Sequence, residues 1–274
     1  MKKRSIAFPA ASALLAGLLL FGCSKHDIFP GQTDKVDKLC DVTSVSYVYY
    51  PGEPVNTGRF YYNKLGDPIR VTFSASGTGR PDFYFWYDNK NRLTDFLGAY
   101  VSDGIIFGYE FWRRYIYQQN RCVGDTSYLF GWAVNGVPSR DEAIYYRVSK
   151  YTYDQYERII KVESADHREG DPVYELTTHY SYNQQGNLTA TTTYFMGNIS
   201  SRYEYTNYDN KVSIHRTHRL WPFLDRNYSL NNPFRADSYN KNDLPLKTSV
   251  PAGQPVGFLY GITLNEASFT YNCK

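Results

Sequence analysis

The stretch Tyr151-Thr152-Tyr153-Asp154-Gln155-Tyr156-Glu157-Arg158-Ile159 recurs in related form as Tyr180-Ser181-Tyr182-Asn183-Gln184-Gln185-Gly186-Asn187-Leu188. In both stretches, tyrosines at alternate positions put their rings on one face of a strand. The Asp or Asn that follows can cap its own backbone, and a turn residue soon after supplies the positive φ that chain reversal requires. Each stretch therefore predicts a strand, a tight turn and the start of a second, antiparallel strand.

The same unit recurs along most of the chain. Good copies also begin at Tyr62 and Tyr87, and weaker ones begin at Tyr117, Tyr205, Tyr239 and Tyr271. With the Tyr205 copy anchored on Tyr208, the leading tyrosines stand 25 to 36 residues apart, which leaves room for two strands and their loops.

Further turn signals fall between these copies, at Asp103-Gly104, Asn135-Gly136 and Gly197-Asn198. Turns inside and between the copies predict an all-β fold: one antiparallel up-and-down meander of about 15 or 16 strands, in which sequence neighbours pair. The run from Leu220 to Phe234 breaks the alternation and predicts a short helix or plug.

The repeated unit resembles the YD repeat of Rhs-type proteins, in the scattered form found in a family of Bacteroides-type lipoproteins of unknown function with a porin-like fold. The resemblance covers about residues 40–274, and the copies at Tyr117, Tyr208 and Tyr271 depart from the pattern. It implies that the meander closes into a large porin-like β-barrel. It assigns no activity.

The N-terminus predicts export and lipid anchoring. Three cationic residues, Lys2 to Arg4, precede an uncharged run that is too short and interrupted for a membrane-spanning helix, as expected of a signal peptide. Leu20-Phe21-Gly22-Cys23 resembles a bacterial lipoprotein signal, with Cys23 as the lipid attachment site. The alternative is an ordinary secreted protein with an incidental Cys23.

These patterns divide the chain into a signal peptide (residues 1–22), a polar tether (23–40) and a β-meander domain (41–274). Ser24-Lys25-His26-Asp27 resembles the export signal of surface lipoproteins, which favours the cell surface over the periplasmic face of the outer membrane. The acyl chains make the membrane a partner of the protein without a spanning segment.

Composition and charge exclude several classes of protein. The 274 residues include 28 tyrosines and are 18% aromatic but only 21% charged, which excludes a disordered chain and a coiled coil. Without the three cationic residues of the signal peptide, 27 of the 30 basic residues remain beside 27 acidic ones. A neutral mature chain lacks the electrostatic footprint of a nucleic-acid partner.

The strands carry too many charges for a lipid-facing apolar band, so a soluble or surface-lying barrel is favoured over a membrane-spanning one. The charged or titratable strand residues are Arg113, Arg114, Arg147, Lys150, Glu175, His179, Arg202 and Glu204.

No catalytic motif is present in the sequence, so no cofactor and no metal are expected. His215 and His218, with Arg216 and Arg219, could form a metal or anion site, but a spacing of three puts the two rings on opposite faces of a strand, so they are interpreted as exposed strand residues. Asp237, Asn240, Asn242 and Asp243 could ligate calcium, but their place in a repeat turn favours turn capping. A pair of distant carboxylates, as in a glycosidase, stays open because such pairs assemble only in the fold.

Aromatic residues outside the repeats are candidates for stacking on sugar rings: Trp132, Trp221 and Phe223. The leading hypothesis is therefore a non-catalytic binding or scaffold module at the outer membrane, with a glycan or a surface protein as partner. The alternatives are a hydrolase with a carboxylate pair and a channel-forming barrel.

Three cysteines remain after lipidation of Cys23, in an oxidising compartment where one pair should form. Cys40 stands at the entrance to the first strand, and Cys273 stands at the exit of the last. If the meander closes, these strands become neighbours, which predicts a Cys40–Cys273 disulfide with Cys122 left over. The alternative is three free, buried thiols.

Overall fold

The computed structural model describes residues 40–50, 52–250 and 256–273. The signal peptide, Cys23 and the tether up to residue 39 lie outside the described residues, so their predictions stay predictions.

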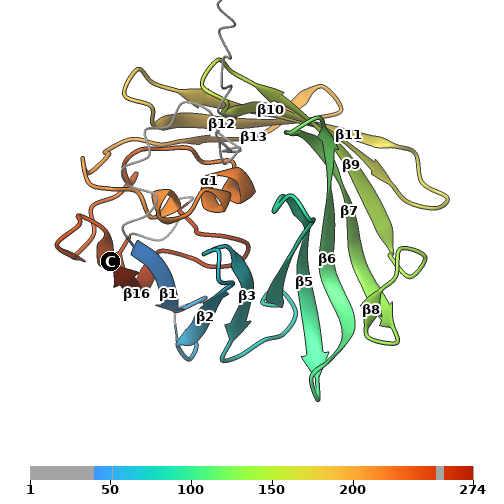
Figure 1. Ribbon diagram of the computed structural model, residues 1–274. Helices are drawn as coiled ribbons and strands as arrows, with labels where there is room; N and C mark the ends of the chain where they lie inside the picture. Colours follow the sequence, from blue (N-terminus) through green and yellow to red (C-terminus); the bar gives the residue numbers. More distant parts are fainter. Residues whose placement is uncertain (1–39, 51, 251–255, 274) are drawn as a thin grey trace, which may run out of the picture.

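The described chain forms one large antiparallel sheet around a small helical insertion, which confirms the all-β meander (Figure 1). The strands are β1 (Cys40–Tyr47), β2 (Asn56–Tyr62), β3 (Pro68–Phe73), β4 (Asp82–Tyr87), β5 (Leu93–Ser102), β6 (Ile105–Gln118), β7 (Arg121–Val134), β8 (Val137–Pro138), β9 (Tyr145–Tyr153), β10 (Ile159–His167), β11 (Tyr174–Tyr182), β12 (Leu188–Phe195), β13 (Asn198–Glu204), β14 (Ser238–Tyr239), β15 (Pro245–Ser249) and β16 (Glu266–Cys273). The 3-10 helix η1 (Ile214–Thr217) and the helix α1 (Leu220–Asp225) lie between β13 and β14.

The sheet curves almost into a ring but keeps two edges. Its strands follow the order β13-β12-β11-β10-β9-β7-β6-β5-β4-β3-β2-β1-β16-β15-β14, so the first and last strands of the chain are neighbours. Among the described residues no ladder joins β13 to β14, and the expected closure into a complete hydrogen-bonded barrel is not formed.

The chain itself explains this opening. Just after β13, Tyr205 N–H still donates to the Thr189 carbonyl of β12 at 2.9 Å, and further on Val212 N–H donates to the Asp243 carbonyl, in the turn between β14 and β15, at 3.2 Å. Residues 213–236, called the plug here, then bury their apolar side chains inside the curve of the sheet (Figure 1). The segment that would pair the two edges is thus used to fill the core.

The repeat turns show the capping that their sequence predicts. The Asp154 side chain accepts hydrogen bonds from the N–H groups of Tyr156 and Arg158, at 2.9 and 3.0 Å. The Asn240 side chain does the same for Asn242 and Leu244, which confirms turn capping there. Because the capping group is two to four residues from its donors, each turn is specified locally.

The leading tyrosines link each copy to the one before it. The Tyr87 hydroxyl donates to the Pro68 carbonyl at 2.6 Å, Tyr117 donates to Leu93 at 2.9 Å, and Tyr153 donates to Cys122 at 2.6 Å. Burial raises the pKa of all three phenols, so they stay protonated donors. These bonds explain why the units carry tyrosine and not phenylalanine at this position.

All repeat turns lie at one end of the sheet, called the turn rim here, together with Cys40 and Cys273. At this rim Asp67 connects a repeat turn to the plug. Its carboxylate accepts from Arg219 at 2.7 Å and from Asn91 at 2.6 Å. Burial opposes ionisation of Asp67, but hydrogen bonds from His218 and Asn91 and the charge of Arg219 outweigh it and lower its pKa to about 2.

An Asp67→Asn variant should lose about 2 kcal/mol of unfolding free energy at pH 7, as follows from a pKa lowered by nearly two units. A carboxyl group whose pKa is lowered by folding stabilises the fold at pH values above its pKa in the unfolded chain, which is near 4. This stabilisation is lost as the pH falls towards 2. Urea unfolding of wild type and variant should therefore differ less at pH 2.5 than at pH 7. Asp103→Asn, at an exposed turn, is the control, and an equal pH response of both variants would contradict the assignment.

His215 and His218 are not the exposed strand residues expected from the sequence. Both are buried, in and just after η1, and that interpretation was wrong. The apolar residues Ile214 and Leu220 beside them pull this segment into the core, so the strand periodicity does not apply.

Candidate functional site

One half of the interior is close-packed. A single apolar cluster contains side chains from β1 to β7, β9, β10, β16, residues 256–264 and the plug. Trp221 is fully buried in it between Phe60, Phe85 and Phe258, at ring distances of 5.7 to 6.1 Å. Phe223 is also buried and packs against Tyr115 at 5.1 Å. Neither ring presents a face to solvent, which corrects the expectation that they form sugar-stacking platforms.

The other half of the interior is polar. In the strand register Arg113 pairs with Ser127, Ser127 with Arg147, and Arg147 with Asp166. Directly paired residues share a face, and Phe111 and Tyr115 on the same face of β6 belong to the core, so this face points inward. Asp125, Ser149, Ser164 and Thr178 lie on the same face of their strands. The polar residues of this face are called the inner polar wall: Arg113, Asp125, Ser127, Arg147, Ser149, Ser164, Asp166 and Thr178.

Solvent reaches part of the inner polar wall although it faces the interior, while Asp125, Ser127 and Ser149 are buried. The side chains of Arg113 and Arg147 are 30% and 35% exposed. Their strand neighbours Arg114 and Lys150 lie on the outer face instead, so the charges noted in the sequence divide between two faces.

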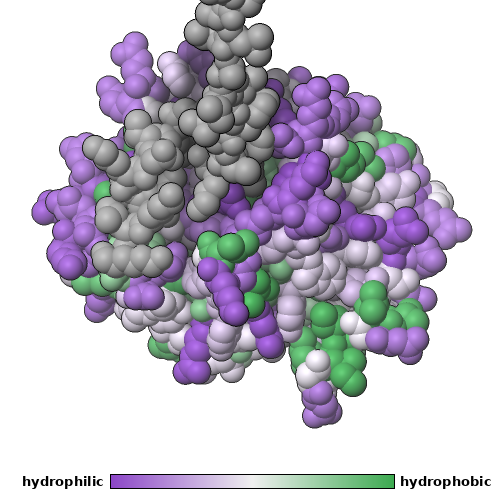
Figure 2. Space-filling model, in the orientation of Figure 1, coloured by the Kyte–Doolittle hydropathy of each residue, from purple (hydrophilic) through white to green (hydrophobic). Residues whose placement is uncertain are grey.

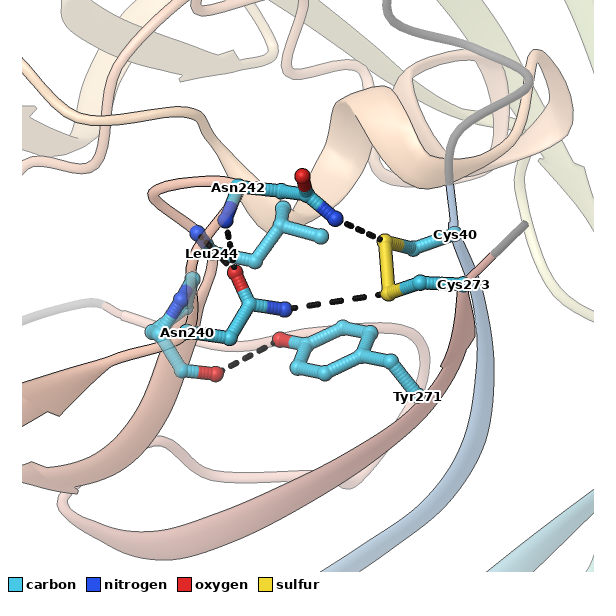
Figure 3. The surroundings of a disulfide bond; sticks show 7 residues. Cys40, Asn240, Asn242, Leu244, Tyr271 and Cys273 are labelled. Carbon is cyan, nitrogen blue, oxygen red and sulfur yellow. Dashed lines mark hydrogen bonds between the residues drawn. A yellow bond between two sulfur atoms is a disulfide. The ribbon is translucent and has the colours of Figure 1, made fainter.

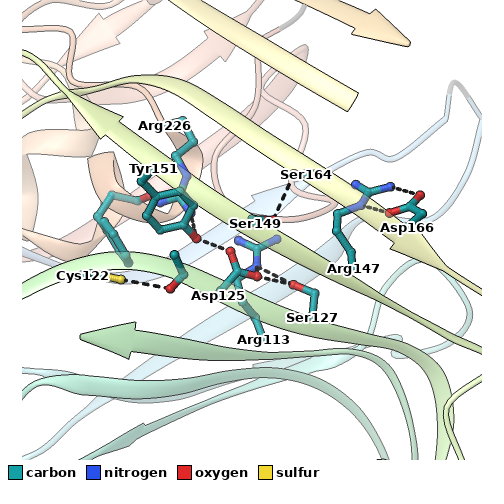
Figure 4. Close-up of polar contacts among 12 residues, drawn as sticks. Arg113, Cys122, Asp125, Ser127, Arg147, Ser149, Tyr151, Ser164, Asp166 and Arg226 are labelled. Atoms are coloured by element: carbon teal, nitrogen blue, oxygen red, sulfur yellow. Dashed lines mark hydrogen bonds and ion pairs between the residues drawn. The ribbon is translucent and has the colours of Figure 1, made fainter. Parts of the chain in front are cut away.

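The charges on the wall are arranged in two groups (Figure 4). Arg147 and Asp166 form a two-pronged ion pair, at 2.5 and 2.7 Å. In the second group Asp125 accepts from the hydroxyls of Ser127, at 2.6 Å, and of Tyr151, and its carboxylate lies 3.7 Å from Arg113.

Arg226 of the plug completes the second group. Its guanidinium donates to the Tyr151 hydroxyl at 2.5 Å and to the Phe223 carbonyl, and it stacks over the Tyr151 ring. Arg113 thus lies directly beside the Asp125 carboxylate, and Arg226 is linked to it through the Tyr151 hydroxyl. This group carries a surplus positive charge inside the molecule.

A pocket of about 290 Å³ lies beside the wall, between β11–β12 and the plug. Tyr180 and Thr191 line it from the sheet, and His215, Asp225 and Phe234 line it from the plug. Burial raises the pKa of Tyr180, while the charges of Arg226 and Arg113 oppose that shift.

The pocket contains a hydrogen-bonded chain of serine, histidine and aspartate. His215 Nε2 lies 2.7 Å from Asp225, and its Nδ1 lies 3.4 Å from the Ser213 hydroxyl. Ser213 is only 1% exposed, and its hydroxyl caps η1 by accepting from the His215 N–H. A nucleophile must reach its substrate, so the geometry indicates that this chain fixes the plug.

The carboxylate pair of a glycosidase would need two convergent carboxylates in the pocket. Of the described residues lining it, Asp225 is the one carboxylate. In the described part of the chain no cluster of three or more His, Cys, Asp or Glu side chains could hold a metal ion. No described helix is long and apolar enough to cross a membrane.

Trp132 lies far from this interior. It is 62% exposed near the end of β7, where other apolar side chains gather at the tips of the β5–β6 and β7–β8 hairpins: Ile105, Phe107, Val134 and Val137. Figure 2 shows apolar surface at this projecting end of the molecule, on an otherwise mainly hydrophilic face. The structure thus separates Trp132 from Trp221 and Phe223.

The predicted cysteine pair meets at the turn rim. Cys40 and Cys273 face each other in the register of β1 and β16 and are joined by a disulfide (Figure 3). Asn242 donates to the Cys40 sulfur at 3.0 Å. Cys122 is free and buried, and burial raises the pKa of its thiol to about 12.

Comparisons with known proteins give distant likenesses. No protein-family model matches the chain, and no curated protein matches it. Among solved structures, a porin-like protein from Bacteroides vulgatus aligns over 84% of this chain and 98% of its own, at 13% identity and a TM-score of 0.45. The complex TcdB2-TccC3-Cdc42 aligns over 58% of this chain and 10% of the other, at 13% identity and a TM-score of 0.20. At such scores the fold assignment rests on the strand pairing of this chain itself.

Proposed function

We propose that this protein is an outer-membrane lipoprotein, anchored through Cys23 and displayed at the cell surface, that binds a glycan without catalysis. The observation that carries the proposal is the inner polar wall, a partly solvent-accessible, hydroxyl-rich and charged surface on the concave side of the sheet. Binding pockets combine a concave wall with a few placed polar groups in this way.

The wall offers the groups that sugars use. Ser149 and Ser164 bond to each other at 3.0 Å, and Thr178 and Thr193 do so at 3.2 Å. Each hydroxyl has one donor and two acceptor positions, so these pairs retain acceptor capacity for a ligand hydroxyl. Tyr180 adds an aromatic ring at the pocket. The exposed Trp132 would contact the glycan separately, at the outer surface.

Filling the pocket should abolish glycan binding. We expect Thr191→Phe to remove the hits that the full-length wild-type protein gives on a glycan array, because the new ring occupies a pocket of about 290 Å³. Thr177→Phe places the same ring on the outer face of β11, opposite Glu163 on β10, and should leave the hits unchanged. Equal loss in both variants, or no hits with the wild type, would argue against glycan binding in the interior.

Lipid anchoring is tested separately. Cys23→Ser should move the protein from the membrane fraction to the soluble fraction, because two or three acyl chains hold firmly and none remains. Cys122→Ser, at a thiol within the domain, is the matched control. Protease shaving of intact cells followed by mass spectrometry then tests surface display. Continued membrane partitioning of an uncleaved Cys23→Ser chain would support a signal anchor instead.

A further inference from the structure

The two ends of the sheet differ in polarity. At the end opposite the turn rim, the hairpins β5–β6 and β7–β8 project from the molecule (Figures 1 and 2) and present five apolar side chains that are between 45% and 63% exposed. They are called the apolar tips here: Ile105, Phe107, Trp132, Val134 and Val137. The repeat turns of the turn rim carry charged side chains instead, such as Asp88, Arg92, Asp154 and Arg158. An exposed apolar patch of this kind marks a contact with a partner or a membrane.

The two hairpins touch each other at the apolar tips. Gly136, in the turn before Val137, lies against β6, where an added Cβ atom would meet the Ile105 side chain at 3.5 Å. Trp132 pairs with Gly108, and a Cβ atom on that glycine would lie 3.4 Å from the indole ring, so the ring packs against β6. The tips therefore form one apolar surface.

This surface carries no charge of its own. Residues 104–109 and 126–139, which build the two tips, contain no Asp, Glu, Lys, Arg or His. A sugar or a charged peptide needs placed polar side chains around its apolar contacts, whereas acyl chains need none. The tips also project outward, a shape that enters a soft surface, and tryptophan is enriched where protein meets the boundary between lipid and water.

We propose that the apolar tips insert into the surface of a lipid bilayer and give the protein a second membrane contact besides its lipid anchor. This goes beyond the proposed glycan binding and does not involve the inner polar wall or the pocket. It assigns Trp132 to lipid, in place of the separate sugar contact considered above. The choice of the anchoring membrane as the bilayer rests on the proposed lipidation of Cys23.

The length of the tether allows both contacts with one membrane. Residues 24–39 separate Cys23 from Cys40 at the turn rim, and 16 extended residues span at most about 55 Å. The strand β6, which runs from the turn rim to the tips, has 14 residues and is about 48 Å long. The apolar tips can therefore reach the bilayer that holds the acyl chains of Cys23.

Lipid crosslinking of the full-length protein tests this contact. The wild type is reconstituted into vesicles of phosphatidylethanolamine and phosphatidylglycerol that contain a phospholipid with a photoactivatable diazirine on an acyl chain. Mass spectrometry should find lipid adducts on the peptides that carry residues 104–107 and 132–137, and none on the repeat turns of the turn rim. The peptide that contains Cys23 reports the anchor in the same experiment.

A charge at the tips should remove the contact. Val137→Asp should lower the adduct yield on the tip peptides at least about fivefold, because a carboxylate is costly in lipid. Leu65→Asp makes the same change in an exposed repeat turn at the other end and should leave the yield unchanged. Val137 and Leu65 are 63% and 75% exposed, so both variants should keep the wild-type melting temperature.

The fluorescence of Trp132 gives a second measurement. The difference between the emission of the wild type and that of Trp132→Phe isolates this one indole. In vesicles its emission should be quenched by phospholipids with a nitroxide on the acyl chain and should be protected from iodide in the water. Quenching by iodide alone would overturn the insertion.

The outcomes separate this inference from the functions proposed above. Adducts at the Cys23 peptide alone would overturn insertion of the tips and leave the anchor intact, whereas adducts at the tips alone would support insertion and argue against the anchor. Without adducts at the tips, a dimer that Val137→Asp dissociates would assign the surface to a second copy of the chain. Glycan-array hits that Val137→Asp removes would assign it to the glycan, and either result would overturn the membrane contact.

Discussion

Replacing Trp221 with alanine should lower the unfolding free energy by about 3–5 kcal/mol, which is a large share of the stability of a typical domain. Trp221 is fully buried at the centre of the plug, and its ring meets Phe60, Phe85 and Phe258 from three separate parts of the chain. Alanine leaves a cavity between partners that the surrounding sheet holds in place, so the site cannot collapse to fill it.

The same substitution at Trp132 is the matched control. Trp132 is 62% exposed, so Trp132→Ala should change stability by no more than about 0.5 kcal/mol. Urea unfolding followed by circular dichroism measures both variants without depending on tryptophan fluorescence. A larger loss from Trp132→Ala than from Trp221→Ala would mean that the plug is not the centre of the core. Glycan binding that falls in Trp132→Ala alone would support its role as a surface contact.

The sequence predicts the local part of this fold well because each repeat turn is capped from within. Asp154 and Asn240 bond to backbone two and four residues away, so the residue pattern alone is enough to place the turns. The tyrosine bonds between copies could not be predicted in the same way. Tyr87 reaches the Pro68 carbonyl only because β4 pairs with β3 in this register, which the residue pattern of a single copy does not determine.

The interior was harder to predict, because alternation shows which residues share a face but not which face is inside. Polar residues on an antiparallel strand usually face water, yet Arg113, Asp125 and Arg147 face inward here. A break in alternation, as at Trp221 and Phe223, likewise shows that the chain leaves the sheet but not where it goes. The Tyr115 hydroxyl finds no hydrogen-bond partner among the described residues, and this has no sequence signal, since only the fold shows which groups surround it.

Removing the disulfide should have the other large effect on stability. The bond joins residues 233 apart in sequence, and a loop of that size corresponds to about 5 kcal/mol in the chain-entropy model, as an upper value. β1 and β16 already pair from end to end in the folded protein, so the bond adds little to the native sheet. Its main effect is to restrict the unfolded chain, and a Cys40→Ser/Cys273→Ser variant should unfold at markedly lower urea concentration.

Reductant provides an internal check on this prediction. Dithiothreitol should destabilise the wild type to the level of the double variant and should not affect the double variant itself. Cys122→Ser should keep the full response to reductant, because the buried thiol of Cys122, with its pKa raised to about 12, stays protonated and does not exchange. Loss of the response in Cys122→Ser, or a Cys40–Cys122 peptide in a non-reducing map, would contradict the pairing. A Cys40–Cys122 bond would also draw the start of β1 away from its partner β16 at the turn rim.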